Sequence, residues 1–403
     1  MAAESKATEL TVADALRRFV PDYLAKYDNP SRGPRTPPHH RKVLGLIVRC
    51  KTGALGDFHY RCESCQASHW VGRSCGDRHC PNCQKEKTQL WLAKQTSKLL
   101  PVQHFVVTFT VPKELRTLLR AHPEVGYEAI FDAGSETIRT LLKNPKNLGS
   151  EKLGFFGVLH TWGRDLKDYH PHVHFVVAGG GVSPDGTQWL QVRRDQLFHP
   201  QPAKMLYKKL FLAALRKAGL YAKLPAGVLK FDWVVNIKPV GNGEAVLKYL
   251  APYVYRVAIC DNRIVSVNDA GVRYRVKPSG KQAYKTRHLN GEAFVRAFAQ
   301  HILPPNFQKV RYYGFMSPNS KLTLATARWL VWLWRGWTHY LSTRSNKAPQ
   351  PKRRAPQCQR CGGPLKRTWM TGPNGELVRR FDPPARGPPP ATASTSQKAS
   401  VIS

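Results

Sequence analysis

The stretch Asp168-Tyr-His-Pro-His-Val-His-Phe-Val-Val177 places three histidines at alternating positions at the start of an apolar run. Successive side chains of a β-strand point to opposite faces, so alternate residues share a face. His170, His172 and His174 would then face the same way and could converge on one metal ion, because imidazole is a common ligand. The polar edge of an ordinary strand would show the same pattern. The stretch therefore predicts a strand, and a metal site is one of two interpretations of it.

The sequence on both sides of this stretch mixes strand-like and helix-like segments. Apolar, β-branched and aromatic runs predict strands over 102–111, 152–161, 173–178 and 231–237. Apolar residues at helical spacing predict helices over 123–142 and 203–218. The chain thus contains a mixed α and β region long enough to bury a core.

The charge of the chain indicates its partner. The sequence has 63 Lys and Arg against 26 Asp and Glu, a formal net charge of +37. Such an excess repels itself unless a polyanion neutralises it, and we expect that polyanion to be nucleic acid. A membrane surface would require an amphipathic or spanning anchor, and the apolar aromatic run Trp329–Trp334 is too short to span a bilayer.

The polar start, Met1-Ala-Ala-Glu-Ser-Lys6, lacks the apolar stretch of a secretory signal, so we expect a cytoplasmic, nucleoid-associated protein.

The cysteines predict zinc. Nine cysteines would permit disulfides in a secreted chain, but six of them crowd into residues 50–83, which favours a metal site in a reducing compartment.

Two Cys-x2-Cys pairs in this crowded segment have the spacing of a four-cysteine zinc site. The pairs are separated by fourteen residues, and the expected zinc ligands are Cys62, Cys65, Cys80 and Cys83. Cys50 and Cys75 leave a second ion, or another choice of four ligands, open. Cations near the ligands can contact phosphates, and the candidates for DNA binding are Arg61, Arg73, Arg78 and Lys85.

A later Cys358-x2-Cys361 pair is a half-site, either a degraded knuckle or one half of a site completed in trans.

Composition divides the chain into regions. The C-terminal region is rich in Pro, Arg, Ser and Thr and is expected to lack a core. The expected regions are a helical and basic segment (1–49), a zinc-binding domain (50–90), a main domain (91–345) and a basic, largely disordered tail (346–403).

Tyrosines form a second cluster, Tyr249-Leu-Ala-Pro-Tyr253. On a helix the two tyrosines would lie one turn apart, about 6 Å along the axis, and face the same way. A tyrosine hydroxyl can attack phosphorus directly, and a divalent ion with open coordination positions can polarise a phosphodiester. Alternatively, Tyr249, Tyr253 and Tyr255 are core residues. Pro252 predicts that the helix begins there or is kinked, which favours Tyr253 as the attacking residue.

Together these motifs resemble a known family. His172-Val-His174 resembles the His-hydrophobic-His core of the HUH nucleases, and Lys248-Tyr-Leu-Ala-Pro-Tyr-Val-Tyr-Arg256 resembles the signature of the two-tyrosine, rolling-circle insertion-sequence transposases within that superfamily. The order of the motifs also matches the family. In that family a cysteine-rich zinc domain precedes the catalytic domain, as Cys62 to Cys83 does here, and the tyrosine helix is followed by a segment similar to residues 301–314 of this chain. The resemblance covers about residues 40–320.

The resemblance implies an α+β fold, in which an HUH endonuclease domain with an antiparallel sheet flanked by helices follows a small zinc-ribbon-like domain. It implies cleavage and joining of single-stranded transposon ends through a 5′-phosphotyrosine intermediate. Tyr249 and Tyr253 would be the nucleophiles, and His172 and His174 would bind Mg²⁺ or Mn²⁺, with Zn²⁺ at the cysteines. We also expect Lys248 and Arg256 to bind DNA.

HUH enzymes generally use a third metal ligand, and two histidines are candidates. His160 is preferred, because 152–161 and 172–178 are expected to be neighbouring antiparallel strands. His170 is the alternative, but Pro171 removes a backbone donor and suggests that the regular strand begins after it. Two other functions remain open: a plasmid replication initiator or relaxase with the same chemistry, and a non-catalytic zinc-dependent DNA-binding regulator.

Overall fold

A five-stranded antiparallel sheet forms the centre of the computed structural model, which describes residues 10–28, 36–193, 195–255, 259–278, 283–336 and 356–381. Every neighbouring pair in the sheet is antiparallel, as the family resemblance implied. In sheet order the strands are β12 (Val310–Gly314), β4 (Gly154–Trp162), β5 (Tyr169–Ala178), β3 (His104–Thr110) and β8 (Val235–Pro239).

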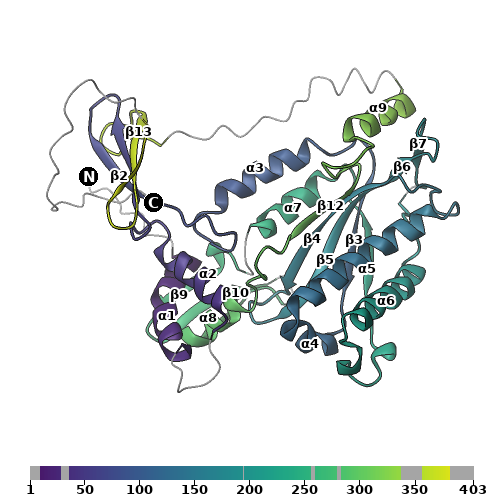
Figure 1. The fold of residues 1–403 in the computed structure, drawn as a ribbon, viewed down its shortest axis with the longest axis horizontal. Helices are drawn as coiled ribbons and strands as arrows, with labels where there is room; N and C mark the ends of the chain where they lie inside the picture. The colour runs from purple at the N-terminus through teal and green to yellow at the C-terminus, as the bar shows by residue number, and fades with distance from the viewer. Residues whose placement is uncertain are drawn as a thin grey trace.

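Helices cover both faces of this sheet (Figure 1). On one face, a core of aromatic and aliphatic side chains joins the sheet to α5 (Pro123–Lys143) and α6 (Pro200–Lys217), with α4 (Arg116–Ala121) beside them. On the other, a second core joins it to α3 (Lys85–Thr96), α7 (Glu244–Val254) and α9 (Leu324–Arg335). The predicted helices over 123–142 and 203–218 correspond to α5 and α6.

Alternation along β5 decides which residues meet which helices. Phe175 belongs to the core under α5 and α6, whereas Val176 belongs to the core under α3, α7 and α9. His172 and His174 have the parity of Val176 and therefore lie on the face that α7 covers. A small hairpin of β6 (Gly180–Val182) and β7 (Trp189–Gln191) extends the chain beyond β5.

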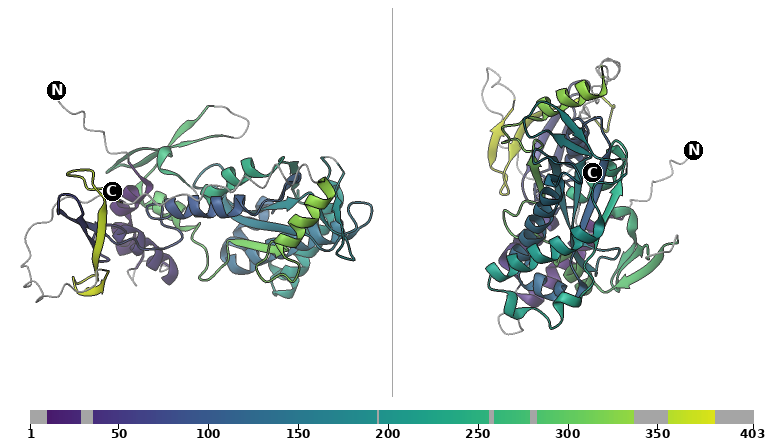
Figure 2. Two further views of the ribbon diagram at one scale, coloured as in Figure 1. Left: turned by 90° about the horizontal axis from the view of Figure 1, so that it is seen from above. Right: turned by 90° about the vertical axis from the view of Figure 1, so that its right-hand side faces the viewer.

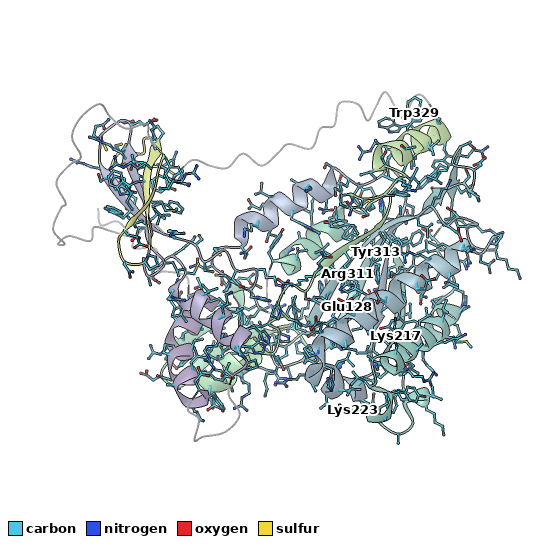
Figure 3. All side chains as sticks on the ribbon, in the orientation of Figure 1. Glu128, Lys217, Lys223, Arg311, Tyr313 and Trp329 are labelled. Atoms are coloured by element: carbon cyan, nitrogen blue, oxygen red, sulfur yellow. The ribbon has the colours of Figure 1, made fainter. Side chains whose placement is uncertain are left out.

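Close packing on the α5 side of the sheet requires a glycine in β4. A Cβ built on Gly157 would lie 2.7 Å from the ring of Phe175 and 3.0 Å from that of Phe131. The edge strand β12 is held to α5 by Arg311, which donates to Glu128 with an Nη1 to Oε2 distance of 2.6 Å (Figure 3). These contacts hold α5 against the strand that carries His160 and against its neighbour β12.

A second group of helices and strands packs around a separate hydrophobic core. Its helices are α1 (Val12–Tyr27), α2 (Pro38–Arg49) and α8 (Gly291–Ala299), and its three-stranded sheet is formed by β9 (Ile264–Asn268), β10 (Gly271–Val276) and β11 (Lys285–Leu289). Residues from 1–49 and from the expected main domain thus share one hydrophobic core. The sequence boundaries at 49 and 91 separate segments that pack together, because a contact between distant segments leaves no local signal.

The zinc-binding segment contributes half of a third sheet. Its order is β14-β13-β1-β2, formed by β1 (Asp57–Cys62), β2 (Ser68–Gly72), β13 (Leu365–Thr371) and β14 (Leu377–Arg380). Figures 1 and 2 show the yellow C-terminal strands beside the purple N-terminal hairpin. The prediction of a disordered tail was wrong for residues 356–381, because β1 offers them a pairing edge.

The tyrosine helix α7 runs through Pro252. It spans Glu244–Val254 and ends two residues after the proline, so Pro252 lies in its last turn and does not begin it. Tyr249 and Tyr253 therefore belong to one helix, one turn apart. Within the described ranges, none of the helices combines the length and apolar character needed to cross a bilayer.

Candidate active site and metal centres

Three histidines from two neighbouring strands gather on the face of the sheet under α7. His160 on β4 is the direct register partner of His172 on β5, and Val158 is the partner of His174. The ring centroid of His160 lies 5.2 Å from that of His172 and 4.6 Å from that of His174. One ligand nitrogen from each of the three lies within 4.8 Å of the others. The structure thus brings His160, the preferred third ligand, to the predicted pair.

Hydrogen bonds orient two of the rings. Nδ1 of His174 lies 2.8 Å from the hydroxyl of Thr108, its register partner on β3. Nδ1 of His172 donates to the carbonyl of His170 at 2.7 Å. Partners at Nδ1 fix the ring orientation and leave Nε2 to serve as the ligand atom.

Burial keeps these imidazoles neutral. It lowers the pKa of His172 to about 3, with a further contribution from His170. Burial first, and then the neighbouring imidazoles, also hold the pKa values of His160 and His174 well below the usual range. Neutral imidazole is the form that coordinates metal, so the donor set fits a divalent cation.

His170 is not part of the group of converging ligand atoms, although its ring centroid lies 4.9 Å from that of His172. Its Nδ1 contacts the guanidinium of Arg116, which also pairs with Asp168 at 3.0 Å. The expectation that the regular strand starts after Pro171 was wrong, since β5 begins at Tyr169. The ladder between β4 and β5 shifts register here, because two steps from His160 to Trp162 oppose three from His172 to Tyr169, and Pro171, which lacks an N–H, lies in the irregular part.

Tyr249 places its ring against the histidine cluster. It lies on α7, its side chain is 55% exposed, and its ring meets that of His174 edge-on with centroids 6.5 Å apart. The backbone of Tyr253 follows one turn later in α7, but its side chain and all of Arg256 lie outside the described residues. Tyr255 ends the helix and packs against the α7-side core.

The cysteines form two clusters among the described residues, and neither is the predicted set of four. One contains Cys50, Cys75, Cys80 and Cys83, and the other contains Cys62, Cys65, Cys358 and Cys361. The predicted grouping was wrong because β2 and the following loop lie between the two N-terminal pairs and carry the chain away from the first. The two pairs therefore belong to different clusters.

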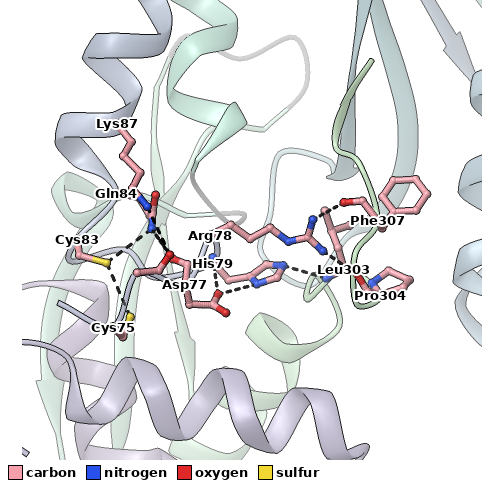
Figure 4. A network of polar contacts seen from close by, with 11 residues as sticks. Cys75, Asp77, Arg78, His79, Cys83, Gln84, Lys87, Leu303, Pro304 and Phe307 are labelled. Carbon is pink, nitrogen blue, oxygen red and sulfur yellow. Dashed lines mark hydrogen bonds and ion pairs between the residues drawn. The ribbon is translucent and has the colours of Figure 1, made fainter. Parts of the chain in front are cut away.

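The loop that carries the first cluster is anchored to the segment before β12 (Figure 4). Arg78 donates to the carbonyl of Pro304 at 2.7 Å and to that of Phe307. Nε2 of His79 accepts from the backbone N–H of Leu303 at 3.1 Å, while Nδ1 contacts Asp77 at 2.9 Å. Burial lowers the pKa of His79, which keeps Nε2 available as an acceptor.

These contacts alter the expected DNA-binding set. The guanidinium of Arg78 is engaged within the protein, and Nη1 of Arg73 donates to the carbonyl of Thr371 at 3.1 Å. Arg61 and Lys248 are exposed. Lys85 begins α3, and its side chain lies outside what the structure describes.

Two residues near the site were not predicted from the sequence. Thr108 orients His174, and its only signal was its place in an alternating strand. Lys309 places Nζ 4.9 Å from the ring centroid of Trp162, and burial lowers its pKa to about 7. It precedes β12, within the segment that carries the family resemblance.

Comparison with known proteins identifies two matching family models. Residues 15–111 match a model described as "Transposase zinc-binding domain", of the IS91 type, and residues 154–322 match a model described as "Putative transposase". The second match contains β4, β5 and α7, and hence the histidine cluster and both tyrosines. No solved structure matches the chain.

Two curated relatives cover most of the chain. One, from Sinorhizobium fredii, is named "Putative transposase y4qJ" and is 37% identical over 76% of this chain and 80% of its own length. The other, from Pseudomonas savastanoi pv. phaseolicola, is the transposase for insertion sequence element IS801 and is 29% identical over 68% of this chain and 70% of its own. The chain belongs to the IS91 family of insertion-sequence transposases.

Proposed function

We propose that this transposase nicks and rejoins single-stranded transposon ends by tyrosine attack beside a histidine-bound divalent cation, in a rolling-circle type of transposition. The observation that carries the proposal is the edge contact between the rings of Tyr249 and His174. It sets an exposed phenol next to three neutral imidazoles that share one face of the sheet.

The covalent step exchanges one phosphate ester for another. The phenolic oxygen of Tyr249 bonds to phosphorus and loses its proton, and the bond from phosphorus to the 3′ oxygen breaks. The DNA remains attached through its 5′ phosphate, and the released 3′ oxygen takes up a proton. Attack by a second 3′ hydroxyl reverses the exchange and joins new strands.

His160, His172 and His174 would hold Mg²⁺ or Mn²⁺. When bound, such an ion polarises the phosphodiester and offsets charge on the leaving oxygen. Thr108 and the carbonyl of His170 orient the imidazoles. Tyr253, one turn along α7, is the candidate for the second attachment, so that two DNA ends can be held in turn.

The remaining charge supports DNA binding. The net charge of +37 favours a polyanion, and exposed Lys248 directly precedes Tyr249 on α7. Zn²⁺ at Cys50, Cys75, Cys80 and Cys83 would have a structural role, because the loop that carries them is anchored to the segment leading into β12. Exposed Lys248 and Tyr249 support a DNA path over α7.

The test is covalent capture of a labelled single-stranded terminus of the protein's own element in Mn²⁺. We expect an adduct that resists denaturation, disappears in the Tyr249→Phe/Tyr253→Phe double variant and persists in Tyr255→Phe. Capture of a plasmid origin in preference to element ends would support an initiator or relaxase. DNA binding without an adduct in any divalent metal would overturn the proposal and support a regulator.

A further inference from the structure

We propose that Cys62, Cys65, Cys358 and Cys361 bind a second zinc ion, which fastens the C-terminal hairpin to the N-terminal zinc-binding domain. The family model for that domain ends at residue 111, so the C-terminal pair lies far outside the segment to which zinc is assigned. This site is independent of the chemistry proposed at the histidines.

The sulfur positions fit a tetrahedral ion. Sγ of Cys62 lies 3.5 Å from Sγ of Cys361, and Sγ of Cys65 lies 3.6 Å from Sγ of Cys358. Four thiolates at a Zn–S distance of about 2.3 Å are separated by about 3.8 Å. A disulfide would instead require about 2.0 Å. All four sulfurs lie within 4.8 Å of one another, which is the arrangement of a closed structural site.

The two Cys-x2-Cys pairs are folded alike. The N–H of Cys62 donates to the carbonyl of Ala67, and that of Gln66 donates back to the carbonyl of Cys62. In the C-terminal pair, the N–H of Cys358 donates to the carbonyl of Gly363, and that of Gly362 donates to the carbonyl of Cys358.

The residue after the second cysteine has a positive φ in both pairs, 59° at Gln66 and 73° at Gly362. Each turn also aims a backbone N–H at sulfur, from Cys65 to Cys62 Sγ at 3.5 Å and from Gly363 to Cys361 Sγ at 3.4 Å. Donors directed at sulfur favour thiolate, the form that binds zinc. Cys358-x2-Cys361, a half-site by its sequence, is therefore the matching half of an intramolecular site.

A buried histidine supports the same conclusion. Nε2 of His69 lies 3.1 Å from Sγ of Cys358, and both residues are buried. A metal-bound cysteine sulfur commonly accepts such a hydrogen bond from a neighbouring residue, and the hydrogen bond fixes the position of the sulfur.

The surrounding sheet places the two halves in register. Cys62 pairs with Leu365 across β1 and β13, and the rings of His59 and Trp369 stack with centroids 3.7 Å apart. Nη2 and Nε of Arg367 donate to the hydroxyl of Tyr60 at 3.0 and 3.1 Å. A metal at one end of β13 would thus close a sheet whose strands are about three hundred residues apart in sequence.

Zinc content of the full-length protein tests the proposal. Every protein compared carries His160→Ala/His172→Ala/His174→Ala, because three imidazoles can also hold Zn²⁺, and wild type below means the native set of cysteines. We expect two zinc ions per chain, and one in Cys358→Ser/Cys361→Ser and in Cys62→Ser/Cys65→Ser. The variant with all four substitutions should also retain one, because both pairs hold the same ion. Cys260→Ser is the matched control, since Cys260 is a free cysteine outside both clusters, and it should retain two.

One zinc ion in the wild type would overturn the proposal, as would two in Cys358→Ser/Cys361→Ser. A wild-type mass about 2 Da low, abolished by reduction, would reveal a disulfide and overturn it too. Cobalt titration of the wild type needs no cysteine substitution: we expect the thiolate charge-transfer band to saturate at two equivalents, and saturation at one would contradict the site. None of these readouts depends on DNA cleavage.

Discussion

Tyr249 on α7 meets His174 on β5 edge-on, with ring centroids 6.5 Å apart and ring planes at 89°. The contact joins the two motifs that define the family resemblance, although a helix, a hairpin and a further strand separate them in the chain. It arises because His174 has the strand parity of the residues under α7. The account therefore depends on metal binding at the sheet and attack from the helix.

Removal of His160 should weaken the divalent site. His160→Ala takes away one of the three clustered imidazoles, so we expect Mn²⁺ affinity to fall by more than about ten-fold. His170→Ala is the control, because Nδ1 of His170 contacts Arg116 and its carbonyl, which accepts from His172, remains in the variant. Mn²⁺ titration of zinc-loaded protein by electron paramagnetic resonance measures both. Equal losses, or a larger loss in His170→Ala, would contradict the assignment of His160 as the third ligand.

The orientation of His174 should depend on Thr108. Thr108→Val keeps the shape of the side chain but removes the hydroxyl 2.8 Å from Nδ1, and we expect Mn²⁺ affinity to fall about 10- to 100-fold. Thr110→Val is matched to it, since Thr110 lies on the same strand and donates to the carbonyl of Val234. Its affinity should stay within about two-fold of wild type. An unchanged Thr108→Val protein would mean that packing alone orients the ring.

Packing against β4 should tolerate no side chain at Gly157. The Cβ of Gly157→Ala would lie 2.7 Å from Phe175, so we expect the free energy of unfolding to fall by about 1–3 kcal/mol. Gly45→Ala, on α2 with nothing within 4 Å of its Cβ, should instead raise it by up to about 1 kcal/mol. Urea unfolding compares the two, and a neutral Gly157→Ala would show that the aromatic rings can move aside.

Buried histidines should make the fold sensitive to acid. Burial lowers the pKa of His104 from 6.5 to about 4, so between these values the unfolded chain binds more protons than the folded one. The stability conferred by neutral His104 is complete above pH 6.5 and is lost as pH falls towards 4. In His104→Gln, the stability lost between pH 7 and pH 5 should be smaller by about 1–2 kcal/mol.

Urea titrations at the two pH values measure this difference. Zinc loss at low pH affects wild type and variant alike, so the comparison isolates His104. Identical pH dependence in the two proteins would show that His104 is protonated in the folded state without cost.

Local patterns were sufficient to predict the two strands of the central sheet that carry the clustered histidines. The alternation in 168–177 and the apolar run at 152–161 predicted β5 and β4, and their pairing brought His160 to His172. The position of Thr108 required the register of β3 against β5, which no local pattern encodes.

The cysteines show where sequence spacing fails. Fourteen residues between two knuckles fit one zinc site, yet the chain between them forms β2 and a loop, and each knuckle finds more distant partners. The C-terminal region looked disordered because its apolar content is low. Its order comes from pairing with β1 and from Cys358 and Cys361, contacts that only the folded chain brings together.

The position of the covalent attachment decides whether α7 supplies the nucleophile. Protein captured on a single-stranded element end in Mn²⁺ would be digested with nuclease and trypsin, and the peptide 249–256 sequenced by tandem mass spectrometry. The account predicts a 5′-linked nucleotide on Tyr249, retained when Tyr253 is replaced by Phe. A nucleotide found only on Tyr255, or on a residue outside α7, would contradict it.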